Sequence, residues 1–174
     1  PEKPEEVGRW HMPGQHTAGG EEPTWEADAH RCHHPMRLGD RLYVSYWHAG
    51  FYILDIEDMT KPKLISGLDW SPPFPWPTHT CLPIPQDIQG RRIMLVADED
   101  VAKLFDSGPA FMWVVNITDE TNPVPFSSFQ IEGLDGSHTP NQTGCHQPVE
   151  QVRGNQIPVA WFANGLRNID ISDP

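Results

Sequence analysis

Apolar and polar residues alternate with a period of two along several short runs of the chain. The clearest runs are RLYVSYW (41–47), FYILDI (51–56), RIMLVADED (92–100) and FMWVVNI (111–117). Such alternation predicts β-strands, and the pairs Ala49-Gly50 and Asn164-Gly165 between runs predict tight hairpin turns. Nineteen prolines and fourteen glycines fall mostly between the apolar runs, which favours strands and turns over helices. We therefore expect an all-β chain.

One motif recurs three times: an apolar strand ending in Asp-Ile or Asn-Ile, then an acidic turn, then proline and a second short strand. It occurs in FYILDIEDMTKPKLISGLDW (51–70), FMWVVNITDETNPVPFSSFQI (111–131) and LRNIDISDP (166–174). Two further apolar runs precede each copy, so each unit carries about four short antiparallel strands. A repeating four-stranded unit predicts a β-propeller blade. A β-sandwich whose turns happen to be similar is the alternative.

The segments YILDIEDMTKP, WVVNITDETNP and GLRNIDISDP resemble the LVIVD repeat, which is a β-propeller repeat. The segments EEVGRW, HAGFYILDI and PKLISGLDWSPPF are similar in particular to a bacterial subgroup of LVIVD-repeat proteins. The resemblance covers nearly the whole chain and implies a propeller of four-stranded antiparallel blades. It implies little about activity, because a repeat of this kind specifies a fold.

We expect residues 1–174 to form one propeller segment. Its parts are the outer strand of a preceding blade (1–12), a first blade (29–70), a second blade (78–131) and an incomplete third blade (144–174). Three blades do not close a ring, since propellers have four to eight. We therefore expect the remaining blades of a six- or seven-bladed ring to come from a longer chain or from a homo-oligomer. The leading outer strand would pair with the final blade of another copy in the second case.

The formal net charge of −12 is spread along the chain without a basic stripe. This distribution argues against nucleic acid and anionic membranes as partners. No apolar run approaches the length of a membrane-spanning helix. Three cysteines are an odd number and too few for a disulfide scaffold. None of these features indicates a compartment.

Histidines recur just before, or at the start of, each predicted inner strand. They lie in HRCHHP (30–35), PTHTCLP (77–83) and GCHQPVE (144–150), and the candidates are His33, His34, His79 and His146. Inner strands surround the central channel of a propeller, so we expect these side chains to converge at one end of it. Neutral imidazoles that converge in this way are ligands for a divalent metal such as Zn, Fe, Cu or Mn.

Strand alternation leaves open whether His33 or His34 faces the channel. Alignment on the proline that follows matches His33 with His146 and leaves His79 two positions early. Glu150 is the candidate catalytic carboxylate, as a metal ligand or as a base, and Asp98 and Glu99 are further candidate carboxylates. His48 and His138 are weaker candidates, because one lies in a hairpin and the other in a loop.

Other interpretations of these residues stay open at this point. The histidines could hydrogen-bond the neighbouring blade, or form a surface cluster, without binding metal. Cys145 beside His146 could form a thiolate–imidazolium pair, although adjacent strand residues point to opposite faces. Two functions follow: a metalloenzyme acting on a small organic substrate, or a non-catalytic propeller that serves as a scaffold for protein or ligand binding.

Overall fold

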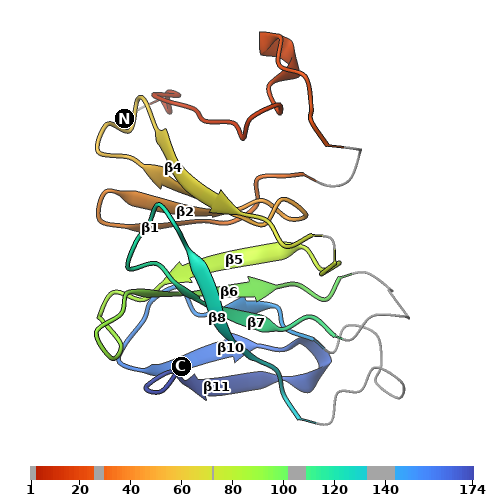
Figure 1. The fold of residues 1–174 in the computed structure, drawn as a ribbon, viewed down its shortest axis with the longest axis vertical. Helices are drawn as coiled ribbons and strands as arrows, with labels where there is room; N and C mark the ends of the chain where they lie inside the picture. Colours follow the sequence, from red (N-terminus) through yellow and green to blue (C-terminus); the bar gives the residue numbers. More distant parts are fainter. Residues whose placement is uncertain (1–2, 26–29, 72, 102–108, 133–143) are drawn as a thin grey trace.

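The computed structural model describes residues 3–25, 30–71, 73–101, 109–132 and 144–174. Within these ranges the chain forms three antiparallel sheets and two short 3-10 turns, η1 (Thr17–Gly19) and η2 (Phe162–Asn164) (Figure 1). The prediction of an all-β fold built of antiparallel blade-like sheets is confirmed. In the part of the chain that is described, no helix has the length and apolarity that crossing a membrane requires.

The sheets follow one another along the sequence, and within each sheet the strands pair in chain order. The first sheet contains β1 (Pro35–Leu38), β2 (Arg41–Ser45), β3 (Phe51–Asp55) and β4 (Lys63–Leu68). The second contains β5 (Thr78–Pro83), β6 (Ile93–Asp98), β7 (Met112–Asn116) and β8 (Val124–Phe129). The third contains β9 (Gln147–Pro148), β10 (Gln156–Ala160) and β11 (Leu166–Asp170). The described residues thus form two four-stranded sheets and one three-stranded sheet.

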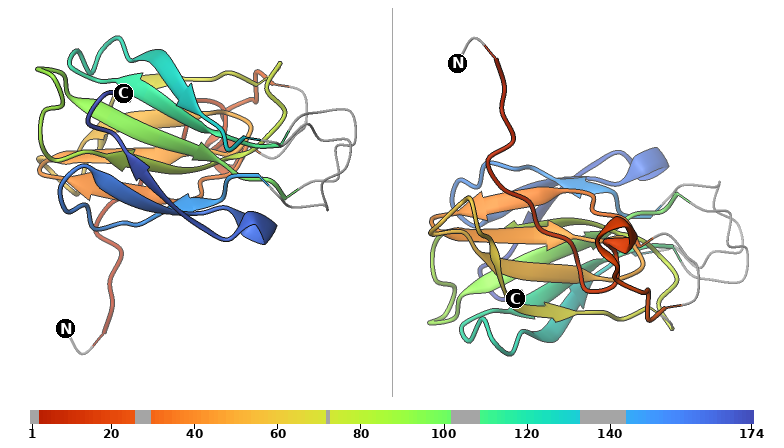
Figure 2. Two further views of the ribbon diagram at one scale, coloured as in Figure 1. Left: turned by 90° about the horizontal axis from the view of Figure 1, so that it is seen from below. Right: turned by 90° about the horizontal axis from the view of Figure 1, so that it is seen from above.

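The second sheet lies between the other two (Figures 1 and 2). Every residue of β5 and of β6 is buried, whereas exposure alternates along β8 at the outer edge. A strand covered on both faces needs a continuous apolar run, and Ile93 to Ala97 supply one. The alternation predicted for the run 92–100 is therefore not seen in residues 93–97, because the sheet is covered on both faces.

Two apolar clusters hold the sheets together. Between the first and second sheets, Tyr43 and Phe51 pack with Met94 and Val96. Between the second and third sheets, the cluster includes Leu82, Leu95, Val114, Val159 and Trp161. Trp161 is fully buried there. Face-to-face packing of successive sheets is the arrangement expected for neighbouring propeller blades.

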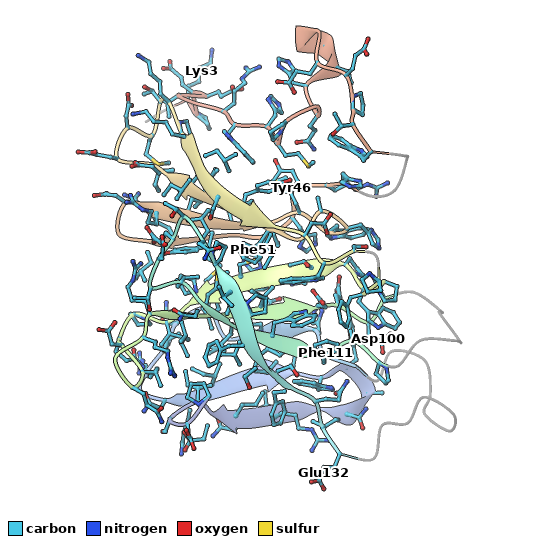
Figure 3. The ribbon with its side chains drawn as sticks, viewed as in Figure 1. Lys3, Tyr46, Phe51, Asp100, Phe111 and Glu132 are labelled. Atoms are coloured by element: carbon cyan, nitrogen blue, oxygen red, sulfur yellow. The ribbon has the colours of Figure 1, made fainter. Side chains whose placement is uncertain are left out.

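The remaining face of the first sheet is covered by the N-terminal segment. The Trp10 ring lies 5.8 Å from the Tyr46 ring and 5.3 Å from the Tyr52 ring, centroid to centroid, and Met12 is buried in the same cluster. In Figure 3, Tyr46 lies on the side of the N-terminal segment and Phe51 on the side of the second sheet.

Residues 3–12 form no strand in the structure. They cross the face of the first sheet, and no other strand of the described residues runs beside them to supply ladder hydrogen bonds. The strand predicted for residues 1–12 is thus absent from the part of that range that the structure describes.

A polar network joins the first and second sheets at the end away from His33. Glu120 accepts hydrogen bonds from Arg41 Nε at 2.8 Å, Tyr43 Oη at 2.7 Å and Arg92 Nη2 at 2.9 Å. Burial alone would raise the pKa of Glu120, but these hydrogen bonds outweigh burial and lower the pKa. Glu120 is therefore held as a carboxylate between two sheets.

Candidate metal centre

The strand register makes three histidines equivalent. In each sheet, one residue of the inner strand pairs with a valine on the second strand. That valine in turn pairs with the third-strand residue that lies three positions before the Asp or Asn of the repeat motif. These inner-strand residues are Pro35, Cys81 and Pro148, opposite Val44, Val96 and Val159. The residues two positions earlier are His33, His79 and His146. Cys81, rather than Pro83, is thus the counterpart of the two prolines, which removes the two-residue mismatch seen in the sequence.

The structure brings the four predicted histidines together, and we call His33, His34, His79 and His146 the histidine cluster. The ring centroid of His79 lies 4.3 Å from that of His33, 4.7 Å from that of His146 and 5.9 Å from that of His34. His79 is therefore the centre of the cluster. It is also buried, being only 7% exposed.

Glu99 is the carboxylate at the centre of the cluster. It lies three residues after Val96, at the position that Trp47 occupies in the first sheet and Phe162 in the third. Each aromatic ring contacts the histidine of its own sheet, with centroids 5.7 Å apart for Trp47 and 4.4 Å for Phe162. The second sheet thus places a carboxylate where the other two place an aromatic ring.

The Glu99 carboxylate lies between imidazoles of two sheets. Its Oε1 atom is 2.8 Å from Nδ1 of His146 and 3.7 Å from Nε2 of His79. The contact with His146 is short but lacks the alignment of a hydrogen bond, so this buried Nδ1 atom has no hydrogen-bond partner among the residues that the structure describes. A buried ring nitrogen without a hydrogen bond is unfavourable, and coordination to a cation would satisfy it.

Three residues offer ligand atoms close enough for one ion. One ligand atom each of His33, His79 and Glu99 lies within 4.8 Å of the other two. Two imidazoles and one carboxylate are the protein ligands of many catalytic zinc sites and of the facial triad that binds non-haem iron. The donor set therefore fits a divalent metal.

The other ring nitrogens of this group are already engaged. Nδ1 of His33 lies 3.3 Å from the carbonyl oxygen of His79 and must carry the proton, because a carbonyl only accepts. The neutral tautomer of His33 that makes this contact has a lone pair on Nε2. Nδ1 of His79 lies 2.7 Å from Oγ1 of Thr80. A hydrogen bond at the far nitrogen is the usual way to orient a histidine that binds metal.

Burial sets the charges of the site. Burial lowers the pKa of His79 to about 3, and the neighbouring His33, His146 and His34 contribute in the same direction. Burial also lowers the pKa of His146 and raises the pKa of Glu99 to about 7. His79 and His146 are therefore neutral donors. Burial disfavours the charged form of Glu99, and a divalent cation would provide the positive charge that stabilises its carboxylate.

His34 and Glu150 form a second pair beside the first group. Nε2 of His34 lies 3.1 Å from Oε1 of Glu150, and Nδ1 of His34 lies 3.1 Å from Oγ1 of Thr80. Glu150 is thus linked to His79 through His34 and Thr80.

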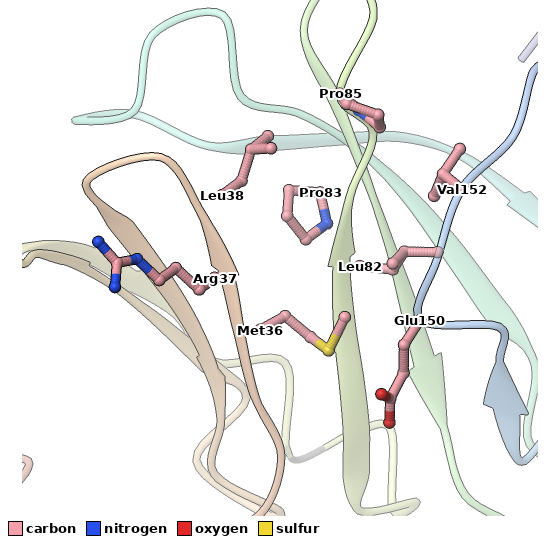
Figure 4. Close-up of a pocket in the computed structure, with 8 residues that line it drawn as sticks. All are labelled: Met36, Arg37, Leu38, Leu82, Pro83, Pro85, Glu150 and Val152. Atoms are coloured by element: carbon pink, nitrogen blue, oxygen red, sulfur yellow. The ribbon is translucent and has the colours of Figure 1, made fainter.

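Glu150 also lines a small groove of about 80 Å³ between the inner strands of the three sheets (Figure 4). Its carboxylate lies at one end of the groove and Leu38 and Pro85 at the other. The groove lining comprises Met36, Arg37, Leu38, Leu82, Pro83, Pro85, Glu150 and Val152. Six of the eight side chains are apolar, and Arg37 and Glu150 are the two charged residues of the lining.

The other candidate residues have different surroundings. Asp98 accepts hydrogen bonds from Thr78 Oγ1 at 2.9 Å and from Trp113 Nε1 at 2.8 Å. It therefore supports the interior of the second sheet. Nε2 of His48 lies 3.1 Å from the carbonyl oxygen of Pro75. His138 lies outside the described residues.

The cysteines are not placed to act as nucleophiles. Cys81 and Cys145 are buried, and burial raises the pKa of both thiols well above the ordinary value. Cys32 is a free cysteine at the surface, and partial burial of its thiol group raises the pKa of that group. A thiolate–imidazolium pair of Cys145 with a histidine is therefore disfavoured.

Two hydroxyl residues of the site carry no signal in the sequence. The Ser45 hydroxyl accepts a hydrogen bond from the backbone N–H of His34 at 2.9 Å and donates one to the carbonyl oxygen of His79 at 2.5 Å. Thr80 contacts both His34 and His79. Once the strand register is known, Ser45 stands out as a polar residue, because its counterparts in the other sheets are the small residues Ala97 and Ala160.

Comparison with known proteins agrees with this fold. The family model of the LVIVD repeat matches residues 38–69 and 151–174. The first stretch spans β2 to β4, and the second spans β10 and β11. Searches of curated proteins and of solved structures found no match.

Proposed function

We propose that this LVIVD-repeat chain holds a divalent metal at the histidine end of its three sheets and acts there on a small organic substrate. The observation that carries the proposal is the Glu99 carboxylate, which lies between His79 and His146, two imidazoles of different sheets. Within the described part of the chain, the buried Nδ1 atom of His146 has no hydrogen bond. The repeat itself accounts for the fold and does not require this arrangement.

The residues divide into three roles in this proposal. His33, His79 and Glu99 are the ligands, and His146 approaches the same carboxylate as a fourth ligand. Glu150 is the acid–base residue, because its carboxylate lies in the groove and contacts His34. Trp47 and Phe162 flank the site with aromatic rings.

The metal would supply Lewis acidity, either polarising a substrate oxygen or lowering the pKa of a bound water. Zinc with such ligands favours hydrolysis or lyase chemistry, and iron favours oxidation. The apolar lining of the groove supports a small molecule as partner. The net charge of −12 disfavours nucleic acid and anionic membranes. The remaining blades of the ring would come from a longer chain or from further copies of this one.

Elemental analysis of untagged protein tests the metal centre. We expect one equivalent of a divalent metal in the wild type and much less in His79→Gln and Glu99→Gln, with circular dichroism showing that each variant is folded. Protein that contains no metal in several preparations, and that binds none when titrated with Zn²⁺, Fe²⁺, Cu²⁺ or Mn²⁺, contradicts the proposal.

A non-catalytic propeller is the second candidate, and one observation favours it. His33 contacts the His79 carbonyl and His34 contacts Thr80, so both histidines of the first sheet hydrogen-bond the second. In that case the histidines only join sheets. Substitution of His33 by Gln would then lower stability by the same amount with and without added metal, whereas a ligand role makes the loss larger when metal is present.

A further inference from the structure

We infer that Thr80 and His34 are positioning residues that transmit the hydrogen-bonding state of Glu150 to His79 and hold His79 in its metal-binding tautomer. The inference rests on the metal centre proposed above. It assigns a function to Thr80, a residue that the ligand set does not include. It also gives Glu150 an effect on the metal centre, although Glu150 is not one of the ligands His33, His79 and Glu99.

Four side chains form a continuous path, which we call the relay. Oε1 of Glu150 lies 3.1 Å from Nε2 of His34, and Nδ1 of His34 lies 3.1 Å from Oγ1 of Thr80. Oγ1 of Thr80 lies 2.7 Å from Nδ1 of His79. The path begins at an exposed carboxylate in the groove and ends at a buried imidazole whose Nε2 faces Glu99.

The number of protons that each group carries fixes which atom donates and which accepts at every step of the relay. A carboxylate in water at neutral pH only accepts hydrogen bonds, so Nε2 of His34 carries the proton toward Glu150. In the neutral tautomer of His34 that donates from Nε2, Nδ1 has a lone pair, which accepts from the single Thr80 hydroxyl proton. The Thr80 oxygen can in turn only accept from His79, so Nδ1 of His79 carries a proton and Nε2 has the lone pair.

The lone pair on Nε2 is the one that a metal beside Glu99 requires. In the reverse tautomer, Nε2 of His79 would carry a proton directed toward Glu99, and the metal would have to displace it. The coupling between Glu150 and the metal is reciprocal. A metal bound to Nε2 of His79 favours the arrangement of protons in which Glu150 accepts a hydrogen bond from His34. Glu150 is thereby kept as an acceptor in the groove, which is the state a general base needs.

The backbone holds the relay in place. His34 and Thr80 form a parallel bridge between the inner strands of the first and second sheets. Thr80 is fully buried, so no water competes for its hydroxyl. Ser45 links the backbone of His34 to that of His79 through its hydroxyl. The hydroxyl group of Thr80 therefore has two fixed partners.

Nitrogen-15 NMR of histidine-labelled full-length chain tests the inference, because the ring nitrogen shifts distinguish the two tautomers. Metal-free wild type should show His79 with the proton on Nδ1, with the signals assigned by His34→Gln and His79→Gln. Thr80→Val, which removes the hydroxyl but keeps the shape, should show a mixture of His79 tautomers. Thr80→Ser should restore the wild-type state.

Zinc affinity, measured by competition with a chromophoric chelator, gives the second readout. We expect Thr80→Val to bind Zn²⁺ about 10-fold to 100-fold more weakly, as loss of an outer hydrogen bond to a ligand commonly does. Thr78→Val is the matched control, since it removes a buried hydroxyl of the same strand that contacts Asp98 and not the relay. It should leave both the His79 tautomer and the zinc affinity unchanged.

Two results would overturn the inference. One is a metal-free wild type in which Nε2 of His79 carries the proton, a measurement that needs no variant to fold. The other is a folded Thr80→Val protein with wild-type tautomer and wild-type affinity. Failure of wild type to take up Zn²⁺ overturns the metal centre instead, and the tautomer of the metal-free protein still decides whether the relay exists.

Discussion

Nδ1 of His146 and Oε1 of Glu99 lie 2.8 Å apart, although the two residues belong to different sheets. His146 precedes β9, and Glu99 follows β6. The contact exists because Asp100, the residue after Glu99, binds the third sheet through its backbone: its N–H donates to the carbonyl oxygen of Cys145 at 3.1 Å. Docking of the third sheet therefore completes the site.

Removing the charge of Glu99 should strongly weaken metal binding without unfolding the protein. Glu99→Gln keeps the size of the side chain but replaces a carboxylate oxygen by an amide. We expect Zn²⁺ affinity to fall by at least about 100-fold, the upper range for loss of an outer partner alone. Glu57→Gln, at an exposed turn of the first sheet, is the control. Equal affinities in the two variants would exclude Glu99 as a ligand.

The same substitution should have a pH-dependent effect on the stability of the metal-free protein. The pKa of Glu99 is about 7 in the fold against an ordinary 4.5, so the folded state holds an extra proton between these values. Binding of this extra proton stabilises the fold fully below pH 4.5, and this contribution of Glu99 is lost as the pH rises through 7. Glu99→Gln should therefore gain stability relative to wild type over this range, by up to about 3 kcal/mol.

Urea unfolding with a chelator present, at about pH 5 and about pH 8, measures this difference. Asp98 and His79 also have shifted pKa values, but they are common to both proteins and largely cancel in the comparison. A difference between wild type and Glu99→Gln that stays constant with pH would show that Glu99 titrates normally.

Glu120→Gln should destabilise the contact between the first and second sheets. The carboxylate accepts from Arg41, Tyr43 and Arg92, and Gln offers one acceptor oxygen in place of two. We expect a loss of about 2 kcal/mol at neutral pH, typical for hydrogen bonds to a charged group. Because the pKa of Glu120 is lowered, its contribution is present above about pH 4.5 and disappears as the pH falls further.

Denaturant unfolding at neutral pH and at about pH 3 checks both parts of this prediction. Glu57→Gln again serves as the control, because the structure gives its side chain neither a hydrogen bond nor an ion pair among the described residues. The prediction is contradicted if Glu120→Gln lowers the free energy of unfolding by as much at about pH 3 as at neutral pH.

Two glycines with the same backbone conformation should differ in their tolerance of alanine. Gly50 and Gly39 have φ values of +64° and +60°. A Cβ atom on Gly50 would lie 2.0 Å from the carbonyl oxygen of Leu68, whereas one on Gly39 would meet nothing within 4 Å. Gly39→Ala should cost about 1 kcal/mol for its left-handed backbone alone.

Gly50→Ala should cost several times more, because the β2–β3 turn would have to move away from the end of β4. Thermal unfolding of the two variants beside wild type measures the difference. Equal losses of stability would show that the turn adjusts freely and that the close approach to Leu68 has no energetic consequence.

The blades could be predicted because their strands combine period-two alternation with a motif that recurs at each third strand. The position of His79 could not be aligned from the sequence, because Pro83 resembles Pro35 and Pro148 but is not their counterpart. Cys81 holds that ladder position in the second sheet. Equivalence between blades follows the hydrogen-bond register, which residue types do not reveal.

Glu99 could be proposed only as one of several carboxylates. It follows the last residue of β6, where alternation no longer determines which way a side chain points. Its counterparts Trp47 and Phe162 have φ values of 48° and 39°, outside the extended range. Residues 3–12 form no strand in the described part of the chain, because ladder pairing depends on a neighbouring strand and not only on local sequence.

Each of the three sheets contributes at least one imidazole to the same small volume. An ion held there would be a cross-link between separate layers of the molecule. Saturation at about 100 times the dissociation constant adds about 2.7 kcal/mol to a folded state that alone binds the ion. In this molecule, that energy would act against separation of the layers, so metal supply would regulate how long the assembly survives.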